Sequence, residues 1–141
     1  MTLDEVITLI TATSNRMNDL YKQTVFDEWA VVALVQHKAR LLGYIGPRKE
    51  DFQNNFINDI RDLRADLLAN KHSPGEFEFA RHGFGTKVEA FVVLSEGIFL
   101  LCNNTTKTMS DITKDPLWLS AQVPFVEMSD RFRSEPLVYP L

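Results

Sequence analysis

Two neighbouring runs of almost uninterrupted apolar residues constrain the fold of this chain more than any other feature of the sequence. They span Val88–Leu94 and Ile98–Cys102, and Ser95-Glu96-Gly97 forms the turn between them. A strand that is apolar on nearly every residue needs cover on both of its faces. Both runs are therefore predicted to be central strands of a sheet that lies between two layers.

Three more segments are predicted to be strands of the same sheet. Glu76–Phe79 alternates polar and apolar residues, which is typical of a strand with one solvated face, and Gly83 and Gly85 indicate the turn that follows it. Trp29–Val35 is rich in β-branched residues and apolar on both faces, and Ala39–Ile45 follows it after a short polar turn. The short connections favour antiparallel pairing within each group of strands.

Two amphipathic helices precede and divide these strands. Thr2-Leu3-Asp4-Glu5 matches a capping box, and an apolar stripe at three-to-four spacing continues from it to about Lys22. Proline suits the first turn of a helix, and Pro47 precedes a long apolar stripe that begins at Phe52. This stripe predicts a helix over Pro47–Asn70.

The C-terminal region, residues 108–141, is predicted to be helical and interrupted by prolines. Ser110–Asp115 indicates a short turn of helix, Asp115-Pro116 a cap followed by the first helical residue, and Pro124 the start of a third piece. Large apolar residues at helical spacing in this region favour a core role over an interaction patch: Trp118, Phe125, Met128 and Phe132. The apolar tail, residues 136–141, either packs on the domain or remains available to a partner.

The predicted order is helix, two strands, helix, three strands and helix, within a single domain over residues 1–141. Strands with two apolar faces require helices on both sides of the sheet. The sequence therefore predicts an α/β (α+β) fold of three α/β/α layers around a five-stranded antiparallel sheet, profilin-like in outline.

Composition argues against several classes of partner. The net charge is −4 and the basic residues are scattered along the chain, so a nucleic-acid-binding surface is not expected. No apolar run approaches the roughly 20 residues that span a bilayer, and acidic residues stand where a secretory signal carries positive charge. The single cysteine, Cys102, cannot form an intramolecular disulfide and lies in an apolar strand. We therefore expect an inert, reduced thiol and a cytoplasmic location without membrane contact.

No group of residues forms a motif for catalysis or metal binding. The three histidines, His37, His72 and His82, lie in predicted turns or loops and lack the spacing and companion ligands of a zinc site. No serine has the G-x-S-x-G context of a hydrolase. We therefore expect no enzymatic activity, no metal and no cofactor.

Two polar segments are candidate contact sites. One is the predicted loop after the last strand, which either caps the following helix or lines a ligand or partner site. Its residues are Asn103, Asn104, Thr105 and Lys107. The other is the polar side of the long helix, which is either a solvated face or a helix-to-helix contact. Its residues are Asn54, Asn58, Arg61 and Asp62.

The chain resembles the roadblock family, within the wider profilin-like and longin-like group. The resemblance covers nearly the whole chain. It rests on the element order, on the hairpin of Trp29–Val35 and Ala39–Ile45 followed directly by the helix Pro47–Asn70, and on the three-stranded meander over Gly75–Lys107. It implies a non-enzymatic protein that forms homodimers, often by pairing the long helices and extending the sheet across two subunits. It also implies binding or regulation of Ras-like GTPases or assembly of larger complexes, and it brings no catalytic residues.

A small-molecule sensor of profilin-like or PAS-like shape is the alternative function. Its pocket would lie between the sheet and the C-terminal helical region. The dimeric domain instead needs a self-complementary surface, which the polar side of the long helix would provide.

Overall fold

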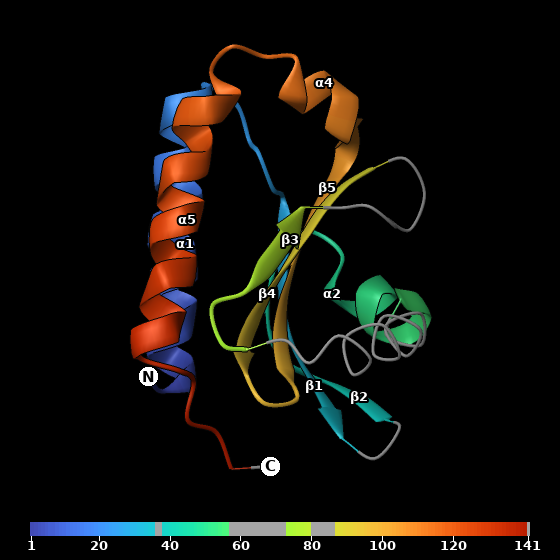
Figure 1. Cartoon of the computed structure of the whole chain (residues 1–141). Coiled ribbons are helices and arrows are strands. Elements are labelled where there is room, and N and C mark those ends of the chain that lie inside the picture. The colour runs from blue at the N-terminus through green and yellow to red at the C-terminus, as the bar shows by residue number, and fades with distance from the viewer. Residues whose placement is uncertain (36–37, 57–72, 80–86, 141) are drawn as a thin grey trace.

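The structure, a computed structural model, describes residues 1–35, 38–56, 73–79 and 87–140 (Figure 1). The elements follow one another in the predicted order. The strands are β1 (Glu28–Val35), β2 (Lys38–Ile45), β3 (Phe77–Phe79), β4 (Lys87–Ser95) and β5 (Ile98–Thr108). The described helices are α1 (Leu3–Tyr21), α2 (Lys49–Asp51), the π-helix η1 (Phe52–Phe56), α4 (Met109–Thr113) and α5 (Trp118–Ser134).

The described strands form one five-stranded antiparallel sheet in the order β2-β1-β5-β4-β3. In its middle, Trp29 of β1 lies opposite Ile45 of β2 and Cys102 of β5. Leu100 of β5 lies opposite Val92 of β4. The strands that are apolar on both faces, β1, β4 and β5, therefore occupy the centre of the sheet, which confirms their predicted position.

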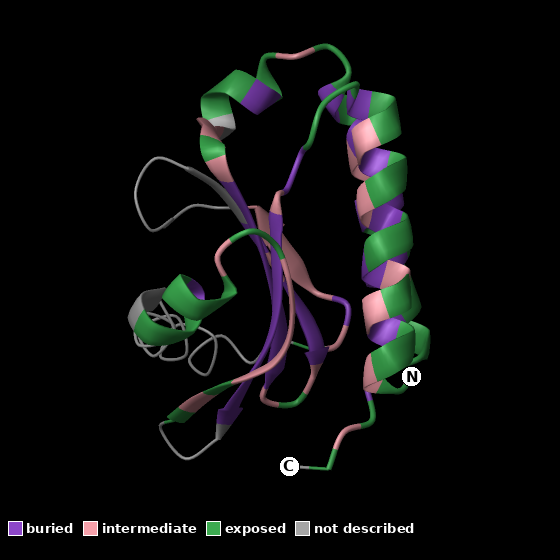
Figure 2. Ribbon diagram, turned by 180° about the vertical axis from the view of Figure 1, so that it is seen from behind, coloured by how far each residue is buried: buried purple, intermediate pink, exposed green. Residues whose placement is uncertain are grey.

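Helices cover both faces of this sheet. α1 and α5 lie side by side and antiparallel against one face, whereas α2 and η1 lie against the other (Figure 1). The central strands are buried between the two layers, and α1 and α5 bury only their inner sides (Figure 2). The predicted α+β class, with three layers around a five-stranded antiparallel sheet, is confirmed.

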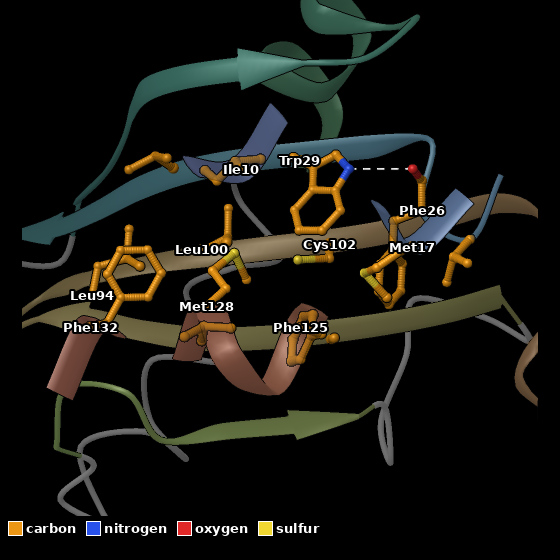
Figure 3. Close-up of a cluster of buried hydrophobic side chains, with 14 of the residues drawn as sticks. Ile10, Met17, Phe26, Trp29, Leu94, Leu100, Cys102, Phe125, Met128 and Phe132 are labelled. Atoms are coloured by element: carbon orange, nitrogen blue, oxygen red, sulfur yellow. Dashed lines mark hydrogen bonds between the residues drawn. The ribbon is translucent and has the colours of Figure 1, made fainter. Parts of the chain in front are cut away.

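The larger core lies between the sheet and the α1–α5 layer. The ring centroid of Phe125 on α5 lies 6.1 Å from that of Phe26 and 5.0 Å from that of Phe79. The indole N–H of Trp29 donates to the Phe26 carbonyl at 3.3 Å, so this buried polar group keeps a partner (Figure 3). The other predicted core residues of this region are buried as well, which confirms their assignment: Trp118, Met128 and Phe132.

The first helix begins where the capping box predicts. The Thr2 hydroxyl oxygen accepts from the Glu5 backbone N–H at 3.2 Å, and the hydroxyl donates to the Glu5 carboxylate at 3.2 Å. At the other end, Lys22 adopts a left-handed conformation with φ of 66° and closes the helix. Both boundaries of α1 therefore agree with the sequence pattern.

The second helix is described only at its start. α2 begins at Lys49, shortly after Pro47, and passes directly into the π-helix η1. Residues 57–72 of the predicted helix lie outside the described residues, as do Gly83 and Gly85. The turn between β4 and β5 is confirmed, because Gly97 has φ of 75° at the predicted position.

The last strand is longer than predicted. β5 does not end at Cys102 but continues through the predicted loop to Thr108. Its extension is held by strand pairing, since Asn103 lies opposite Glu28 of β1 and Thr108 lies opposite Lys87 of β4. The loop assignment of residues 103–107 is therefore wrong.

Pro124 does not open a separate helical piece. It lies inside the continuous helix α5, which begins at Trp118 rather than at Pro116. A proline inside a helix removes one hydrogen bond to the preceding turn. Pro124 nevertheless belongs to the buried side of α5 together with Ala121, and packing against the core offsets that loss. Asp115 lies just before the helix, and its carboxylate accepts a hydrogen bond from the Leu117 N–H at 2.9 Å.

The C-terminal tail packs on its own domain. Leu137 is buried, and its N–H donates to the Leu94 carbonyl at 3.1 Å. The Val138 N–H donates to the Met1 carbonyl at 2.8 Å, and the Met1 amino group donates to the Pro136 carbonyl at 2.8 Å. Residues 136–138 of the predicted tail are thus attached to the domain, with Leu137 buried and the Val138 side chain exposed, whereas Leu141 lies outside the described residues.

Candidate functional site

A buried carboxylate, Glu28, is the most distinctive polar feature of the described residues. Glu28 is the first residue of β1, and its side chain is 0% exposed. A carboxylate taken out of water is strongly destabilising unless it gains partners. Its partners come from three separate parts of the chain: Tyr44 on β2, Arg48 just before α2, and Asn103 on β5.

Both oxygens of the Glu28 carboxylate are occupied. Arg48 binds them as a fork, with Nε 2.7 Å from Oε2 and Nη2 2.9 Å from Oε1. The Tyr44 hydroxyl donates to Oε2 at 2.5 Å, and the Asn103 amide donates to Oε1 at 2.8 Å. The Tyr44 oxygen in turn accepts from the Arg48 backbone N–H at 3.1 Å. These four residues form a connected network, here called the Glu28 cluster.

The network keeps Glu28 charged. Burial alone raises the pKa of a carboxyl group, but the hydrogen bonds that this one accepts, first from Arg48, outweigh burial and lower the pKa of Glu28. The hydrogen bond to Glu28 raises the pKa of Arg48. Burial, followed by the hydrogen bond to the same carboxylate, raises the pKa of Tyr44. The Glu28 cluster therefore holds an ionised carboxylate through hydrogen bonds from a guanidinium, a hydroxyl and an amide group. This carboxylate is not poised to accept a proton.

The Glu28 cluster attaches the start of α2 to the sheet. A Cβ atom at Gly46 would lie 2.8 Å from the Tyr44 hydroxyl oxygen, so the turn from β2 to α2 passes directly over the cluster. Phe52, at the start of η1, is 2% exposed, and its ring centroid lies 5.7 Å from that of Tyr44. The polar network and the buried Phe52 ring, which packs in a second core with residues such as Val32 and Leu101, both attach the described part of this layer to the sheet.

Sequence reasoning missed this cluster, because its members form no local motif. Glu28 and Asn103 are 75 positions apart. The only signals in the sequence are a single acidic residue at the start of the apolar run Trp29–Val35 and an arginine directly after Gly46-Pro47. That Glu28 needs a buried partner can be recognised only when β1 is known to lie in the middle of the sheet.

The predicted contact segment, residues 103–107, is used inside the fold. Asn103 belongs to the Glu28 cluster, and the Asn104 amide donates to the Val25 carbonyl at 2.8 Å. The Asn104 side-chain oxygen accepts from the backbone N–H of Lys107 at 2.8 Å. Asn104 therefore shapes the end of β5 and holds the connection between α1 and β1.

The remaining residues of this segment hold the same connection. The Thr105 N–H donates to the Asp27 carboxylate at 3.0 Å, and the Thr105 hydroxyl donates to its other oxygen. The Lys107 ammonium donates to Gln23 and lies 5.4 Å from the centroid of the Tyr21 ring. A role of residues 103–107 in binding a ligand or partner stays a prediction.

Asn54 is the one predicted interface residue that the structure describes. It is exposed and lines a shallow, open hollow of about 490 Å³. The hollow is lined by Pro47, Arg48, Lys49, Glu50, Asp51 and Asn54. The other predicted interface residues, Asn58, Arg61 and Asp62, lie outside the described part of the chain.

Among the candidate reactive residues, the structure describes the cysteine but not the three histidines. His37, His72 and His82 lie outside the described residues. Cys102 is buried in β5, and burial raises the pKa of its thiol well above the ordinary value. A buried thiol with a raised pKa is a poor nucleophile. The prediction of an inert thiol agrees with this environment.

Side chains fill the space between α5 and the sheet, where the sensor alternative would place its pocket. Phe125, Met128 and Phe132 project from α5 into the space between this helix and the sheet (Figure 3). All of them are buried. The described part of this interlayer space is therefore a packed core.

No protein-family model matches the chain, and no curated protein matches it significantly. Within the described ranges, no helix is long and apolar enough to cross a membrane. The fold itself defines the class: an α+β protein in which helices cover both faces of a five-stranded antiparallel sheet.

Proposed function

We propose that this chain is a non-enzymatic, homodimeric interaction or regulatory domain of the cytoplasm, similar to roadblock proteins. Its partner is a small Ras-like GTPase or a larger complex that it helps to assemble. The packed interior carries this proposal, because buried side chains such as Phe125 fill the space between α5 and the sheet. A domain built in this way offers outer faces to other molecules, and outer faces suit protein partners.

The ionised and fully hydrogen-bonded state of the Glu28 carboxylate also supports a non-enzymatic role. Both oxygens of Glu28 are held by donors of the chain itself, and the lowered pKa of Glu28 keeps it ionised. A catalytic carboxylate usually has a pKa near the working pH and can reach a substrate. Glu28 meets neither condition, whereas it fits a role in positioning α2.

The start of the second helix provides the face that we propose for the dimer. Lys49, Glu50 and Asp51 are exposed and of mixed sign, and Asn54 lies beside them. In a two-fold dimer the same patch of both subunits meets itself. A patch with both signs can place acid against base across the axis, and Arg61 and Asp62 continue this mixture along the sequence.

Light scattering across a concentration series tests the proposal. We expect a mass twice 16.2 kDa that persists on dilution. Arg61→Glu and Asn54→Lys place a repulsive or bulky charge in the proposed patch and should shift the mass toward the monomer. Asn15→Lys is the matched control, because Asn15 is an exposed asparagine on α1, on the other side of the sheet, and its substitution should leave the mass unchanged.

A monomer at every concentration would overturn the proposed dimer. A stable dimer that neither Arg61→Glu nor Asn54→Lys weakens would place the contact on another surface. A dimer that both substitutions weaken would justify binding assays with purified small GTPases in their two nucleotide states.

A further inference from the structure

β2 is an edge strand, and only one of its two sides is paired in the described residues. The strand order β2-β1-β5-β4-β3 gives it β1 as its neighbour, and no other described strand lies beside it (Figure 1). β2 has eight residues, whereas β3 at the opposite edge has three. A long edge presents backbone donors and acceptors with which another strand can pair.

The pairing with β1 shows which backbone groups of β2 point outward. The Leu34 N–H of β1 donates to the Gly97 carbonyl at 2.7 Å, in the turn beside β5 and away from β2, and the Leu34 carbonyl oxygen lies on the same side. Residues directly opposite in an antiparallel pair exchange either both hydrogen bonds or neither. Ala39 lies opposite Leu34, so its N–H and carbonyl point to the open side, as do those of Leu41 two positions further along.

The side chains of this open segment alternate between charged and apolar. Lys38 and Arg40 are exposed, whereas Ala39 and Leu41 are partly buried and pack against the second core on the α2 side of the sheet. Successive side chains of a strand point to opposite faces, so the two cations lie together on the other face. Within the described residues, no ion pair or side-chain hydrogen bond engages either cation.

We propose that the outer edge of Lys38–Leu41 binds an extended acidic segment of a partner protein, which joins the sheet as an additional antiparallel strand. Apolar residues of this segment lie opposite Ala39 and Leu41 and exchange backbone hydrogen bonds with them. Its carboxylates alternate with these residues and lie opposite Lys38 and Arg40, where opposite charges attract across the strands.

The two cations also disfavour a second copy of β2 as the occupant. In an antiparallel two-fold pair of β2 strands, Lys38 and Arg40 of both subunits gather on the same face, and like charges on neighbouring strands are destabilising. The regular part of the strand is also short. The register of the β1–β2 pair shifts between Val31 and Val32, which leaves Leu42 without an opposite residue. An acidic segment fits this short edge without the repulsion.

This inference goes beyond the proposed function. It concerns backbone pairing of a partner with the edge of the sheet, whereas the proposed dimer surface consists of side chains at the start of the second helix, such as Asn54. The test of the β2 edge uses the full chain and synthetic peptides, so it requires neither a dimer nor a GTPase.

Binding of a fluorescent peptide tests the inference. The probe is a short peptide of alternating glutamate and valine, blocked at both ends, and its anisotropy is measured during titration with the full chain at low and high salt. We expect saturable binding that weakens as the salt concentration rises, because exposed charges are screened. A peptide with lysine in place of each glutamate should not bind.

Two methylated forms of the acidic peptide separate strand pairing from simple charge attraction. Valines opposite Ala39 and Leu41 direct their N–H groups toward β2, so methylation of the valine nitrogens removes the ladder donors. Methylation of the glutamate nitrogens, which point away from β2, is the matched control. Only the first form should lose affinity. Binding of the unmodified peptide should also slow hydrogen exchange at the Ala39 and Leu41 amides.

Charge reversal on β2 places the contact at its edge. Lys38→Glu combined with Arg40→Glu should weaken binding of the acidic peptide by about tenfold or more and allow the lysine peptide to bind, because both cross-strand attractions become repulsions. Lys114→Glu combined with Arg131→Glu is the matched control. It changes the net charge equally at two exposed residues, in the turn after α4 and on α5, and should leave both affinities unchanged.

The absence of saturable binding up to about 1 mM peptide would overturn the inference and leave the two cations as protection of an open edge. Acidic-peptide binding that survives the double reversal on β2, or methylation of the valine nitrogens, would also reject it. The methylated peptides decide the question with the unchanged chain if the reversed variant does not fold. Light scattering separates the two proposals. Peptide binding to a monomer keeps this inference and rejects the dimer, whereas a dimer without peptide binding does the reverse.

Discussion

Glu28 and Arg16 each take part in an ion pair, and the two pairs have similar lengths. Their surroundings differ, so the two pairs contribute differently to the stability of the fold. The Arg16–Glu127 pair is 55% exposed on both sides, and such a pair contributes about 0–1 kcal/mol. The Glu28 carboxylate is fully buried, so removal of its charge leaves Arg48 without its main partner. Loss of one member of a buried pair costs about 3–5 kcal/mol, and the partial exposure of Arg48 reduces that cost.

The stability that Glu28 provides should depend on pH. We expect Glu28→Gln to lower the free energy of unfolding by about 2–4 kcal/mol at neutral pH. The folded-state pKa of Glu28 is lowered relative to that of the unfolded chain, which is about 4.3. The stabilisation is therefore present above the unfolded pKa and is lost as the pH falls through the folded pKa. Urea unfolding of both chains at about pH 7, 5 and 3 measures this difference.

Glu127→Gln is the control for this series. It removes an exposed carboxylate and should change the free energy of unfolding by less than about 0.5 kcal/mol. A deficit of Glu28→Gln that stayed the same from about pH 7 to about pH 3 would contradict a charged Glu28 in the folded state.

At the scale of the elements, the contact between β3 and α5 is unusually close. Gly75, which leads into β3, has φ of 83°, and its N–H donates to the Val93 carbonyl of β4 at 2.8 Å. A Cβ atom there would lie 2.6 Å from the Ser129 carbonyl oxygen and 2.1 Å from the Arg133 Cγ. The backbone of α5 thus lies directly against the entry to the edge strand.

Gly75→Ala should therefore disturb two elements at once. We expect it to lower the free energy of unfolding by roughly 2–4 kcal/mol, because the methyl group meets the α5 backbone in addition to the strained φ. Gly97→Ala is the matched control. Gly97 has a similar φ of 75°, but the nearest atom to its Cβ position is the Leu34 carbonyl oxygen at 3.3 Å. Its expected cost is about 1–2 kcal/mol.

Urea unfolding of the two alanine variants under the same conditions makes the comparison. Equal losses of stability would mean that the approach of α5 to Gly75 adds nothing to the backbone strain.

At the scale of the whole molecule, Phe125 joins parts of the chain that are far apart. Its ring lies 5.2 Å from the ring of Phe77 and 5.0 Å from that of Phe79, both on β3, and 6.1 Å from that of Phe26, which precedes β1. These contacts connect α5, the edge strand and the entry to a central strand. Phe125 is therefore an aromatic centre of the α1–α5 face of the sheet.

Phe125→Ala is expected to lower the free energy of unfolding by about 3–5 kcal/mol, because a buried aromatic ring is replaced by a cavity. This loss is a large part of the roughly 5–15 kcal/mol that stabilises a typical domain. Phe125→Leu keeps most of the apolar volume and should cost less than about 2 kcal/mol. Thermal unfolding followed by circular dichroism measures both, and a loss below about 1 kcal/mol for Phe125→Ala would show that the core closes without this ring.

The sequence alone determined the features that depend on local pattern. The capping box at Thr2 placed the start of α1, and the runs Val88–Leu94 and Ile98–Cys102 identified two central strands. The antiparallel pairing, the three layers and the core face of the C-terminal helix followed from the same patterns. Periodicity and capping are properties of residues close together in the chain, so they can be read without the fold. For the candidate interface, the sequence placed Asn54 correctly on an exposed polar surface.

Only the tertiary structure decided the features that depend on distant partners. β5 runs past Cys102 because β1 and β4 pair with its polar end, and α5 continues through Pro124 because the core holds its buried side. The Glu28 cluster combines residues of three strands and a helix start, up to 75 positions apart. The physical reason is the same in each case: a polar or helix-breaking residue is stabilised by what packs against it, and the partner is brought there by the fold.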